Sequence, residues 1–489
     1  MPSLRVRREN DAPVRADADF VLYWMISARR LDSNFGLQRA VEWSRGLGRP
    51  LVILEALRIG YRWASDRLHR FALDGMAENA ARLRDSRVTH LAYVEPEEGA
   101  GKGLLETLAR RAAVVVTDEF PSFFLPRMVR AAGEALPVRL EVVDSNGLLP
   151  LAAAEKTYGA AYHFRRFLQK ELPAHLEAFP DAHPLIGDPL PTFGEQGGSA
   201  PGRDGMVEGR WPLGIPEDLS GFEIDHGVAP VPDSGGAGAA KERLEAFVAG
   251  DLDRYAEDAN DPDADVTSRL SPYLHWGHLS SHQIFEAVAA REEWSRDDLA
   301  SRADGTREGW WGMGESAEAF LDQLVTWREL GFVFNAQRSD YGEYESLPEW
   351  ARETLEEHED DERPHLYSLE EFRDARTHDP LWNAAQRQLR REGWIHNYLR
   401  MLWGKKILEW SPTPREALET MIRLNDRWAV DGRDPNSYNG IFWCLGRFDR
   451  GWPERPVFGK VRSMSSDSTR RKVSVDGYLE RYGSGEETS

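Results

Sequence analysis

The stretch PLVILEALRIGYRWASDRLHRFALDGMAENAARLRDSRVTHLAYVEP, residues 50–96, decides the fold of the first part of the chain. Two short apolar runs, 50–57 and 90–96, flank the segment 65–85, in which apolar residues recur at helical spacing. A strand, a helix and a second strand in this order predict two parallel strands with the helix packed on the sheet.

The same pattern extends on both sides of this unit. Apolar runs at 20–25, 113–120 and 138–144 predict three more buried strands. We therefore expect an N-terminal α/β domain over residues 1–150, with a five-stranded parallel sheet and helices on both of its faces. Ligands of such sheets bind beyond the carboxyl ends of the strands, but no GxGxxG or P-loop pattern identifies a nucleotide here.

The rest of the chain has a different composition. Residues 151–240 are expected to form an interdomain connection, a helix followed by a loop rich in Gly and Pro from residue 187 onward. From residue 241 the segments 315–337, 381–410 and 414–430 show 3.6-residue periodicity. The sequence thus predicts an all-helical C-terminal domain over residues 241–489.

Length and composition exclude several classes of protein. The 489 residues are too many for one ordinary core, so two or three domains are expected. No apolar run is long enough to span a bilayer, and the first twenty residues form a polar lead-in without the apolar stretch of a secretory signal. The single cysteine, Cys444, allows no internal disulfide, which favours a reducing, cytoplasmic location.

The net charge of −21 argues on its face against a nucleic-acid partner, because phosphate contacts need Lys and Arg. The charge is unevenly distributed, however. Acidic residues gather at 95–98 and 356–362, whereas basic residues gather in GKKILEW (404–410) and in the tail 459–472. Since binding is local, an acidic protein of this kind can still hold a basic groove.

Hydroxyl residues crowd a predicted helix start in TSRLSPYLHWGHLS, residues 267–280. Thr267, Ser268 and Ser271 precede Pro272, and hydroxyls with free backbone N–H groups at a helix start suit a phosphate. An ordinary N-cap explains the same residues. In the loop DGRDPNSYNG (431–440), Asp431 and Asp434 either bind sugar hydroxyls or a ring edge, or face solvent.

Three further features have both a structural and a functional explanation. Asn425 stands among helix formers, where Asn usually has a local hydrogen-bonding reason, either structural or toward a cofactor ring. In RMLWGKKILEW (400–410), a predicted helix, Trp403 and Trp410 share a face about 10.5 Å apart along the axis. Core packing is the ordinary explanation of such a stripe. The histidines lack the spacing of a zinc site, so no metal ligand is assigned.

Taken together, these segments resemble the photolyase/cryptochrome family, and most of all the class II cyclobutane pyrimidine dimer photolyases. The most specific stretches are LSPYLHWGHLS, THDPLWNAAQ, RMLWGKKILEW, LNDRWAVDGRDPN and GWPERPVFGK, in family order over nearly the whole chain. The resemblance implies a Rossmann-like α/β antenna domain followed by an all-helical domain that binds FAD. Relatives of this kind carry a deazaflavin, a folate or no antenna pigment, and the sequence does not identify which of these applies.

The resemblance assigns roles around the cofactor residue by residue. Tyr255, Thr267, Ser268, Leu270 and Ser271 would hold the FAD phosphates and ribityl chain, and Arg328, Arg400, Asp431, Asp434 and Asn436 would line the rest. Asn425 would face the flavin N5. Trp382, Trp403 and Trp410 match tryptophans that carry an electron from the surface to FAD, so the stripe would serve electron transfer as well as packing.

The implied activity is light-driven DNA repair by fully reduced FAD, with the dimer flipped out of the duplex. Trp327 and Trp443 match the aromatic residues that cradle the lesion, and Met401 matches a methionine typical of dimer-repairing members. The basic residues Lys460, Arg462, Arg470 and Arg471 would meet phosphates of UV-damaged DNA. The protein is expected to act as a monomer, without a membrane or a metal.

Three departures from the family pattern lie close to the lesion side. Gln323 stands where class II members usually carry Glu, RELGFVFN (328–335) replaces RELADNF, and WCLGRFDRGW (443–452) is one residue shorter than its equivalent. Two alternatives therefore stay open, a flavin photoreceptor without repair activity and a photolyase of altered lesion specificity such as (6-4). Met401 argues against the latter, because the (6-4) group places a histidine there.

Overall fold

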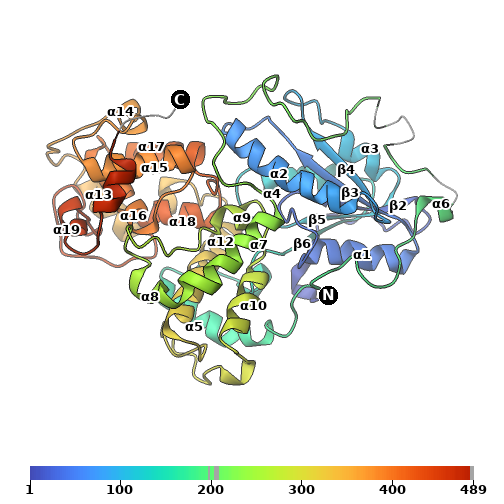
Figure 1. The fold of residues 1–489 in the computed structure, drawn as a ribbon, viewed down its shortest axis with the longest axis horizontal. Helices are drawn as coiled ribbons and strands as arrows, with labels where there is room; N and C mark the ends of the chain where they lie inside the picture. Colours follow the sequence, from blue (N-terminus) through green and yellow to red (C-terminus); the bar gives the residue numbers. More distant parts are fainter. Residues whose placement is uncertain (197–198, 203–206, 208, 485–489) are drawn as a thin grey trace.

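The computed structural model describes residues 1–196, 199–202, 207 and 209–484. Figure 1 shows an α/β part, which contains the N-terminus, beside a helical part formed mainly by the later segments of the chain. The fold class expected from the sequence, an α/β domain followed by a helical domain, is confirmed. The predicted boundaries at 150 and 240 remain predictions, and the Gly/Pro-rich connection lies partly outside the described residues.

The sheet has six strands, in the order β1-β6-β5-β2-β3-β4. The five predicted strands are present and pair in parallel, but the expected count of five is wrong. The additional strand β1 pairs antiparallel with β6 at the edge. Its sequence, VRR, is too short and too polar to predict a strand. It pairs with β6 through the backbone, and Val6 packs against the core on the α1 face of the sheet. The strands are β1 (Val6–Arg8), β2 (Phe20–Met25), β3 (Leu51–Leu57), β4 (Thr89–Val94), β5 (Ala112–Asp118) and β6 (Leu140–Val143).

The five parallel strands are largely apolar because both faces of the sheet are buried. Helices α1 (Phe35–Leu47) and α2 (Asp66–Leu83) pack on the face that carries Tyr23 and Ile53. Helices α3 (Leu104–Ala109) and α4 (Leu125–Ala135) pack on the opposite face, which carries Leu22 and Val52. From β2 the chain continues to β3 and β4 on one side, whereas β5 and β6 lie on the other side of β2. The strand order therefore reverses between β2 and β5.

The helical part contains two packed cores. One is built around α5, α7, α10, α11 and α12, and the other around α13 and α15 to α18 together with α20. The helices are α5 (Ala161–Glu171), α6 (Phe193–Gln196), α7 (Ala237–Ala246), α8 (Tyr255–Asp258), α9 (Ser271–His275), α10 (Ser281–Arg291), α11 (Glu315–Leu321), α12 (Arg328–Gln337), α13 (Glu349–Glu357), α14 (Leu369–Arg373), α15 (Pro380–Glu392), α16 (Asn397–Trp410), α17 (Pro414–Trp428), α18 (Pro435–Trp443), α19 (Ser466–Arg470) and α20 (Asp476–Tyr482).

The helix predicted over 381–410 is interrupted. Helix α15 ends at Gly393, which has φ of 66°, a left-handed conformation that glycine adopts without steric cost. Helix α16 then starts at Asn397 and contains the whole of the predicted helix 400–410. The segment predicted over 315–337 is helical throughout, but a π-helical segment, Asp322–Trp327, joins α11 to α12.

Buried polar contacts fix the two parts against each other. Arg67 of α2 donates to the carbonyls of Leu389 (3.2 Å) and Trp428 (2.7 Å), near the ends of α15 and α17. Glu329 of α12 accepts the backbone N–H groups of Leu148 (2.7 Å) and Leu149 (3.1 Å), after β6. Both side chains are about 2% exposed, so these contacts position the helical part rigidly over the carboxyl ends of the strands.

Candidate functional site

The loop before α9 carries the hydroxyl residues that the sequence predicted to bind a phosphate. Arg243 donates to the carbonyls of Thr267 (2.7 Å) and Ser268 (2.8 Å), which fixes the loop backbone. Thr267 Oγ1 is buried and has no hydrogen-bond partner among the described residues. Since a buried hydroxyl needs a partner, this position fits an oxygen atom of a bound phosphate or sugar. Leu270 is buried in the same loop, and Ser268 and Ser271 are half-buried.

Tyr255 lies on α8, where its ring packs edge-to-face against Phe247 (5.9 Å) and Phe320 (5.4 Å). Burial raises the pKa of the Tyr255 phenol, so its hydroxyl stays protonated and can donate a hydrogen bond.

The loop 431–436 brings two buried carboxylates next to a half-buried arginine, Arg400. A guanidinium nitrogen of Arg400 lies 3.4 Å from Asp431 Oδ1. Asp434 caps α18 by accepting the backbone N–H of Asn436 (2.9 Å), and its other oxygen lies 3.3 Å from His275 Nδ1. The arrangement links α9, α16 and the start of α18 around acceptor groups that suit sugar hydroxyls. The side chain of Asn436 is exposed.

Asn425 is 3% exposed within α17, and two neighbours hold its amide. The Nδ2 group donates to Asp426 Oδ1 (3.0 Å) and to Ser437 Oγ (2.8 Å). Burial raises the pKa of the Asp426 carboxyl, which also accepts the Tyr438 hydroxyl (3.2 Å). Sequence reasoning missed these residues as supports of Asn425. The Asp that directly follows it in RLNDRW was the available signal.

The three tryptophans of the predicted electron route are all buried, with 0 to 2% of each side chain exposed. Trp382 and Trp410 pack edge-to-face with ring centroids 6.1 Å apart. Trp382 Nε1 donates to the carbonyl of Trp403 (3.0 Å), and Trp403 Nε1 donates to Gln386 Oε1 (2.9 Å). Along α16, Trp403 lies about one turn after Arg400 and Trp410 about three turns after it.

Gln323 and Trp327 lie four residues apart in the π-helical segment and are both half-buried, although their neighbours Leu324, Val325 and Thr326 are buried. Single π-helical turns are frequent at functional sites. Asn439 of α18 donates to the carbonyl of Trp327 (3.1 Å). An aromatic face and an amide are therefore available to a partner on the same surface.

Trp443 at the end of α18 lies between two cations. Lys405 Nζ is 4.9 Å from its ring centroid, and the Arg462 guanidinium is 5.6 Å from it. Lys405 is fully buried and donates to the carbonyl of Cys444 (2.7 Å), and burial lowers the pKa of its ammonium group to about 8. Arg462 also lies 4.9 Å from the ring of Trp452. Because Lys405 is buried, only the half-buried rings of Trp443 and Trp452 and the half-buried Arg462 are available to a stacked base and its phosphate.

The other predicted residues of the DNA side are less closely grouped. Met401 is half-buried on α16, and Lys460 is exposed. Arg470 and Arg471 are exposed at the end of α19, which Ser466 ties to Asp379 at the start of α15. The two arginines thus belong to a different helix from the Trp443 cluster, and their predicted role with DNA remains a prediction.

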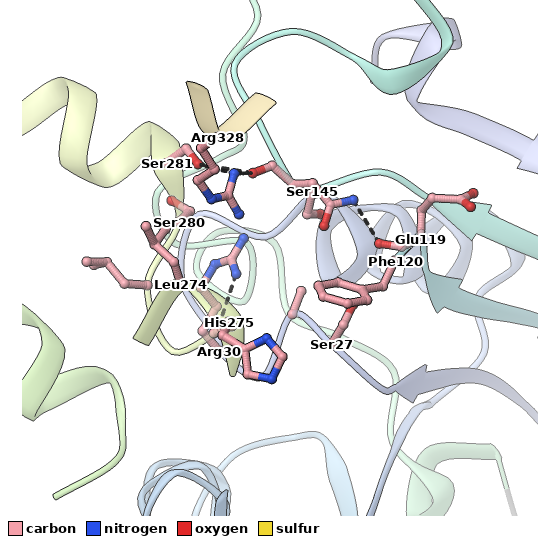
Figure 2. A pocket seen from close by; sticks show the side chains of 14 residues that line it. Ser27, Arg30, Glu119, Phe120, Ser145, Leu274, His275, Ser280, Ser281 and Arg328 are labelled. Carbon is pink, nitrogen blue, oxygen red and sulfur yellow. Dashed lines mark hydrogen bonds between the residues drawn. The ribbon is translucent and has the colours of Figure 1, made fainter. Parts of the chain in front are cut away.

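A small cavity lies where the strand order reverses, between the carboxyl ends of β2, β5 and β6 and the helical part. Figure 2 shows that Arg30 and Arg328 both point toward this space. Arg328 donates to the carbonyl of Asn146 (2.7 Å) and to Ser281 Oγ (3.2 Å), so it faces the α/β part. Burial lowers the pKa of both guanidinium groups. The cavity measures about 20 Å³, room for about one water molecule.

In the part of the chain that the structure describes, no helix is both long and apolar enough to cross a membrane. Within the same residues, no three His, Cys, Asp or Glu side chains come together in a way that could hold a metal ion.

Comparison with known proteins assigns these features to one family. The model of the FAD binding domain of DNA photolyase matches residues 320–406. A deoxyribodipyrimidine photo-lyase of Methanothermobacter thermautotrophicus is 32% identical over 98% of this chain and 97% of its own length. Proteins of the same name from Oryza sativa subsp. japonica (34% identical, 94% of this chain and 86% of the relative) and Potorous tridactylus (32%, 95% and 81%) are similarly related.

Solved structures share the fold at lower identity. A bacterial class III photolyase from Agrobacterium tumefaciens superposes with a TM-score of 0.65 at 17% identity, over 95% of this chain and 86% of that one. A cryptochrome from Synechocystis sp. PCC6803 gives a TM-score of 0.65 at 15% identity, over 95% and 88%. From its full-length similarity to the named photo-lyases, this chain belongs to the photolyase/cryptochrome family.

Proposed function

We propose that this chain is a deoxyribodipyrimidine photo-lyase of the class II type, which uses light to split cyclobutane pyrimidine dimers in DNA into two pyrimidines. One observation carries the proposal. The segment that matches the photolyase FAD-binding family, 320–406, contains both the half-exposed Gln323–Trp327 turn and the buried Trp382 and Trp403. A surface for the lesion and a route for electrons thus lie on one flavin-binding segment.

When bound in its fully reduced form, FAD would supply light-driven one-electron chemistry for splitting the dimer. The unpaired buried hydroxyl of Thr267 supports a role in holding the cofactor phosphates, together with Tyr255, Ser268, Leu270 and Ser271. Asp431 and Asp434 would accept hydrogen bonds from sugar hydroxyls, and Arg400 holds Asp431 in place. Arg328 and Asn436 complete the proposed set.

Asn425 is proposed to present its amide to the flavin N5 edge. Its support by Asp426 and Ser437 fixes the amide in one orientation, because both of the neighbouring groups accept from Nδ2. A fixed dipole needs no reorganisation when the charge of the ring changes.

On the lesion side, Trp327 and Trp443 are proposed to stack against the flipped dimer, a contact worth about 1–3 kcal/mol per base. Gln323 would donate amide hydrogen bonds to the dimer carbonyls, and Met401 would pack beside it. Lys460, Arg462, Arg470 and Arg471 would bind phosphates of the damaged strand. Trp382, Trp403 and Trp410 would bring electrons inward to restore the reduced cofactor.

Two finer assignments accompany this proposal. An antenna pigment, deazaflavin or folate, would bind at the strand ends beside Arg30, and the cavity there would have to widen to admit it. The buried Cys444 and the lack of any possible internal disulfide support a reducing, cytoplasmic location for a monomeric enzyme.

A repair assay tests the proposal. The purified, reduced protein is illuminated with blue light in the presence of an oligonucleotide with one thymine cyclobutane dimer, and in parallel with a (6-4) oligonucleotide. Light-dependent loss of the cyclobutane dimer, with no loss in the dark, is expected. Repair of the (6-4) lesion alone would show that Gln323 marks an altered specificity, and flavin photoreduction without any repair would indicate a photoreceptor.

A further inference from the structure

The proposed electron route ends in a residue that solvent does not reach. Trp410 is 2% exposed, so an electron lost from it must be replaced through its neighbours. Tyr367 and His378 are those neighbours on the outer side, with ring centroids 5.6 Å and 5.0 Å from that of Trp410. The backbone N–H of Tyr367 also donates to the carbonyl of Trp410 (3.1 Å), which fixes their relative position.

Tyr367 and His378 form a hydrogen-bonded pair suited to moving a proton. The Tyr367 hydroxyl accepts the backbone N–H of His378 (3.0 Å), so its own proton is free to point to His378 Nδ1, 2.6 Å away. Partial burial, together with the neighbouring ring of His365, lowers the pKa of His378, which keeps the imidazole uncharged and able to accept. The ring of His365 stacks on that of His378, with the ring centroids 3.8 Å apart, and both residues are exposed.

A cavity of about 380 Å³ opens beside Tyr367, a size typical of small-molecule sites. Tyr367 forms part of its wall, and Leu366, which is 54% exposed, lies at its edge. Ser411, 2% exposed, lines the cavity with an Oγ that has no hydrogen-bond partner among the described residues. An unsatisfied buried hydroxyl in a cavity wall indicates a polar ligand group.

The charges of the cavity limit what can bind. Glu416, Glu419 and Arg423 are its charged lining residues, and Arg423 is paired with Glu419. The formal charge of the lining is therefore −1, which disfavours anionic reductants. A small, uncharged molecule with hydroxyl or thiol groups fits both the charge and the free Ser411 hydroxyl.

We propose that this cavity binds the external electron donor, a small uncharged thiol or dithiol, and that Tyr367 passes its electron to Trp410. The inference rests on the tryptophan route of the proposed function. When an electron has left Trp410 inward, Tyr367 gives one electron to Trp410, and its phenolic proton moves to His378 Nδ1. The thiol then gives a hydrogen atom to the Tyr367 oxygen, which breaks S–H and remakes O–H. His378 returns its proton to solvent, and two such steps convert one dithiol into a disulfide.

Dithiothreitol is the probe for the site itself. Saturation-transfer NMR in the dark, without oxygen, should detect dithiothreitol on the unchanged protein. The signal should be lost in Thr420→Trp, whose side chain fills the cavity from α17. In photoreduction, the half-saturating concentration of dithiothreitol should rise about tenfold in this variant, as expected when about 1.4 kcal/mol of binding is lost. An equal melting temperature would show that the variant is folded.

A charge variant tests the selectivity without blocking the cavity. Glu416→Gln keeps the side-chain acceptor at the start of α17 and makes the lining neutral. The half-saturating concentration of the anion ascorbate should fall about fivefold, whereas that of dithiothreitol should stay unchanged. Glu357→Gln, on the exposed face of α13, makes the same change in net charge and should alter neither value.

Tyr367→Phe tests the relay. It should retain the dithiothreitol signal in NMR, lose the tyrosyl radical seen by electron paramagnetic resonance after illumination, and refill oxidised Trp410 about tenfold more slowly. An unchanged dithiothreitol dependence in folded Thr420→Trp would overturn the donor site. Trp410→Phe separates this failure from that of the proposed function, because photoreduction at the unchanged rate in that variant would show that the tryptophan route itself is wrong.

Discussion

Replacing Glu329 by Gln should remove a pH dependence from the contact between the two parts of the chain. Glu329 is 2% exposed and accepts the backbone N–H groups of Leu148 and Leu149. Burial raises the pKa of its carboxyl group from 4.5 to about 7, even though these hydrogen bonds and the nearby Arg328 and Arg5 act in the opposite direction. The folded protein therefore holds a proton at pH values where the unfolded chain has lost it.

The sign and size of the effect follow from this difference. Between pH 4.5 and 7 the folded state binds more protons than the unfolded state. The stabilisation from the protonated Glu329 is therefore complete below pH 4.5 and is lost as the pH rises through 7. The full loss is about 3 kcal/mol, of which about 2 kcal/mol falls between pH 5 and pH 7.5. Gln carries no titrating group. The substitution should lower the free energy of unfolding by about 1 kcal/mol at pH 5, because the Gln NH₂ group faces one of the two backbone N–H donors.

The assay compares urea unfolding of the unchanged protein and the Gln variant at pH 5 and pH 7.5, with hydrogen exchange of the Leu148 and Leu149 amides as the local measure. Other groups, such as His69 and His278, titrate equally in both proteins, so they cancel in the comparison. Between pH 5 and pH 7.5 the free energy of unfolding should fall by about 2 kcal/mol more in the unchanged protein than in the variant. Equal pH dependence of both proteins would refute the assignment of the proton to Glu329.

Three further outcomes are expected. Arg67→Ala should lower the free energy of unfolding by about 3–5 kcal/mol, because it leaves buried helix-end carbonyls without their charged donor, and a loss below about 1 kcal/mol would contradict this. Trp403→Phe should slow flavin photoreduction at least about tenfold, measured by absorbance under blue light, while the chemically reduced enzyme repairs dimers normally. Gln323→Glu should raise the repair rate per photon absorbed on a cyclobutane dimer. An unchanged or lower yield would mean that the amide already serves the lesion as well as a carboxyl group does.

The buried strands could be predicted because their physical cause lies in the local sequence. Runs such as 20–25 and 113–120 are apolar on consecutive residues since both faces of the sheet are covered, and all five predicted strands are present. Strand β1 could not be predicted in this way, because its three residues pair through the backbone with a strand more than 130 positions later. The polar lead-in is correspondingly more ordered than its composition indicates, and Arg5 is buried within it.

In the candidate site, too, some features are predicted by the local sequence and others are not. The roles of Trp382, Trp403 and Trp410 are predictions from the resemblance, and the helical spacing of Trp403 and Trp410 predicted the shared buried face that these two residues have on α16. The cavity beside Tyr367 was not predicted, because its walls come from the segment 366–369 and from 411–423, brought together only by the packing of the helices. No local pattern of residues marks an empty space between distant segments.

The motif LSPYLHWGHLS shows why a family signature alone does not separate ligand contacts from structural ones. A Cβ atom on Gly277 would lie 1.8 Å from the carbonyl oxygen of Ser27, so glycine is required there for the α/β part to dock. Ser281, the residue directly after the motif, donates to the carbonyl of Asn146 (3.0 Å), which also crosses between the two parts. Thr267, four residues before the motif's first Ser, is different, because its buried hydroxyl has no partner among the described residues. A hydroxyl that the fold has already satisfied contributes to domain docking, whereas the unsatisfied buried hydroxyl of Thr267 supports our proposal that the cofactor binds on that side of the motif.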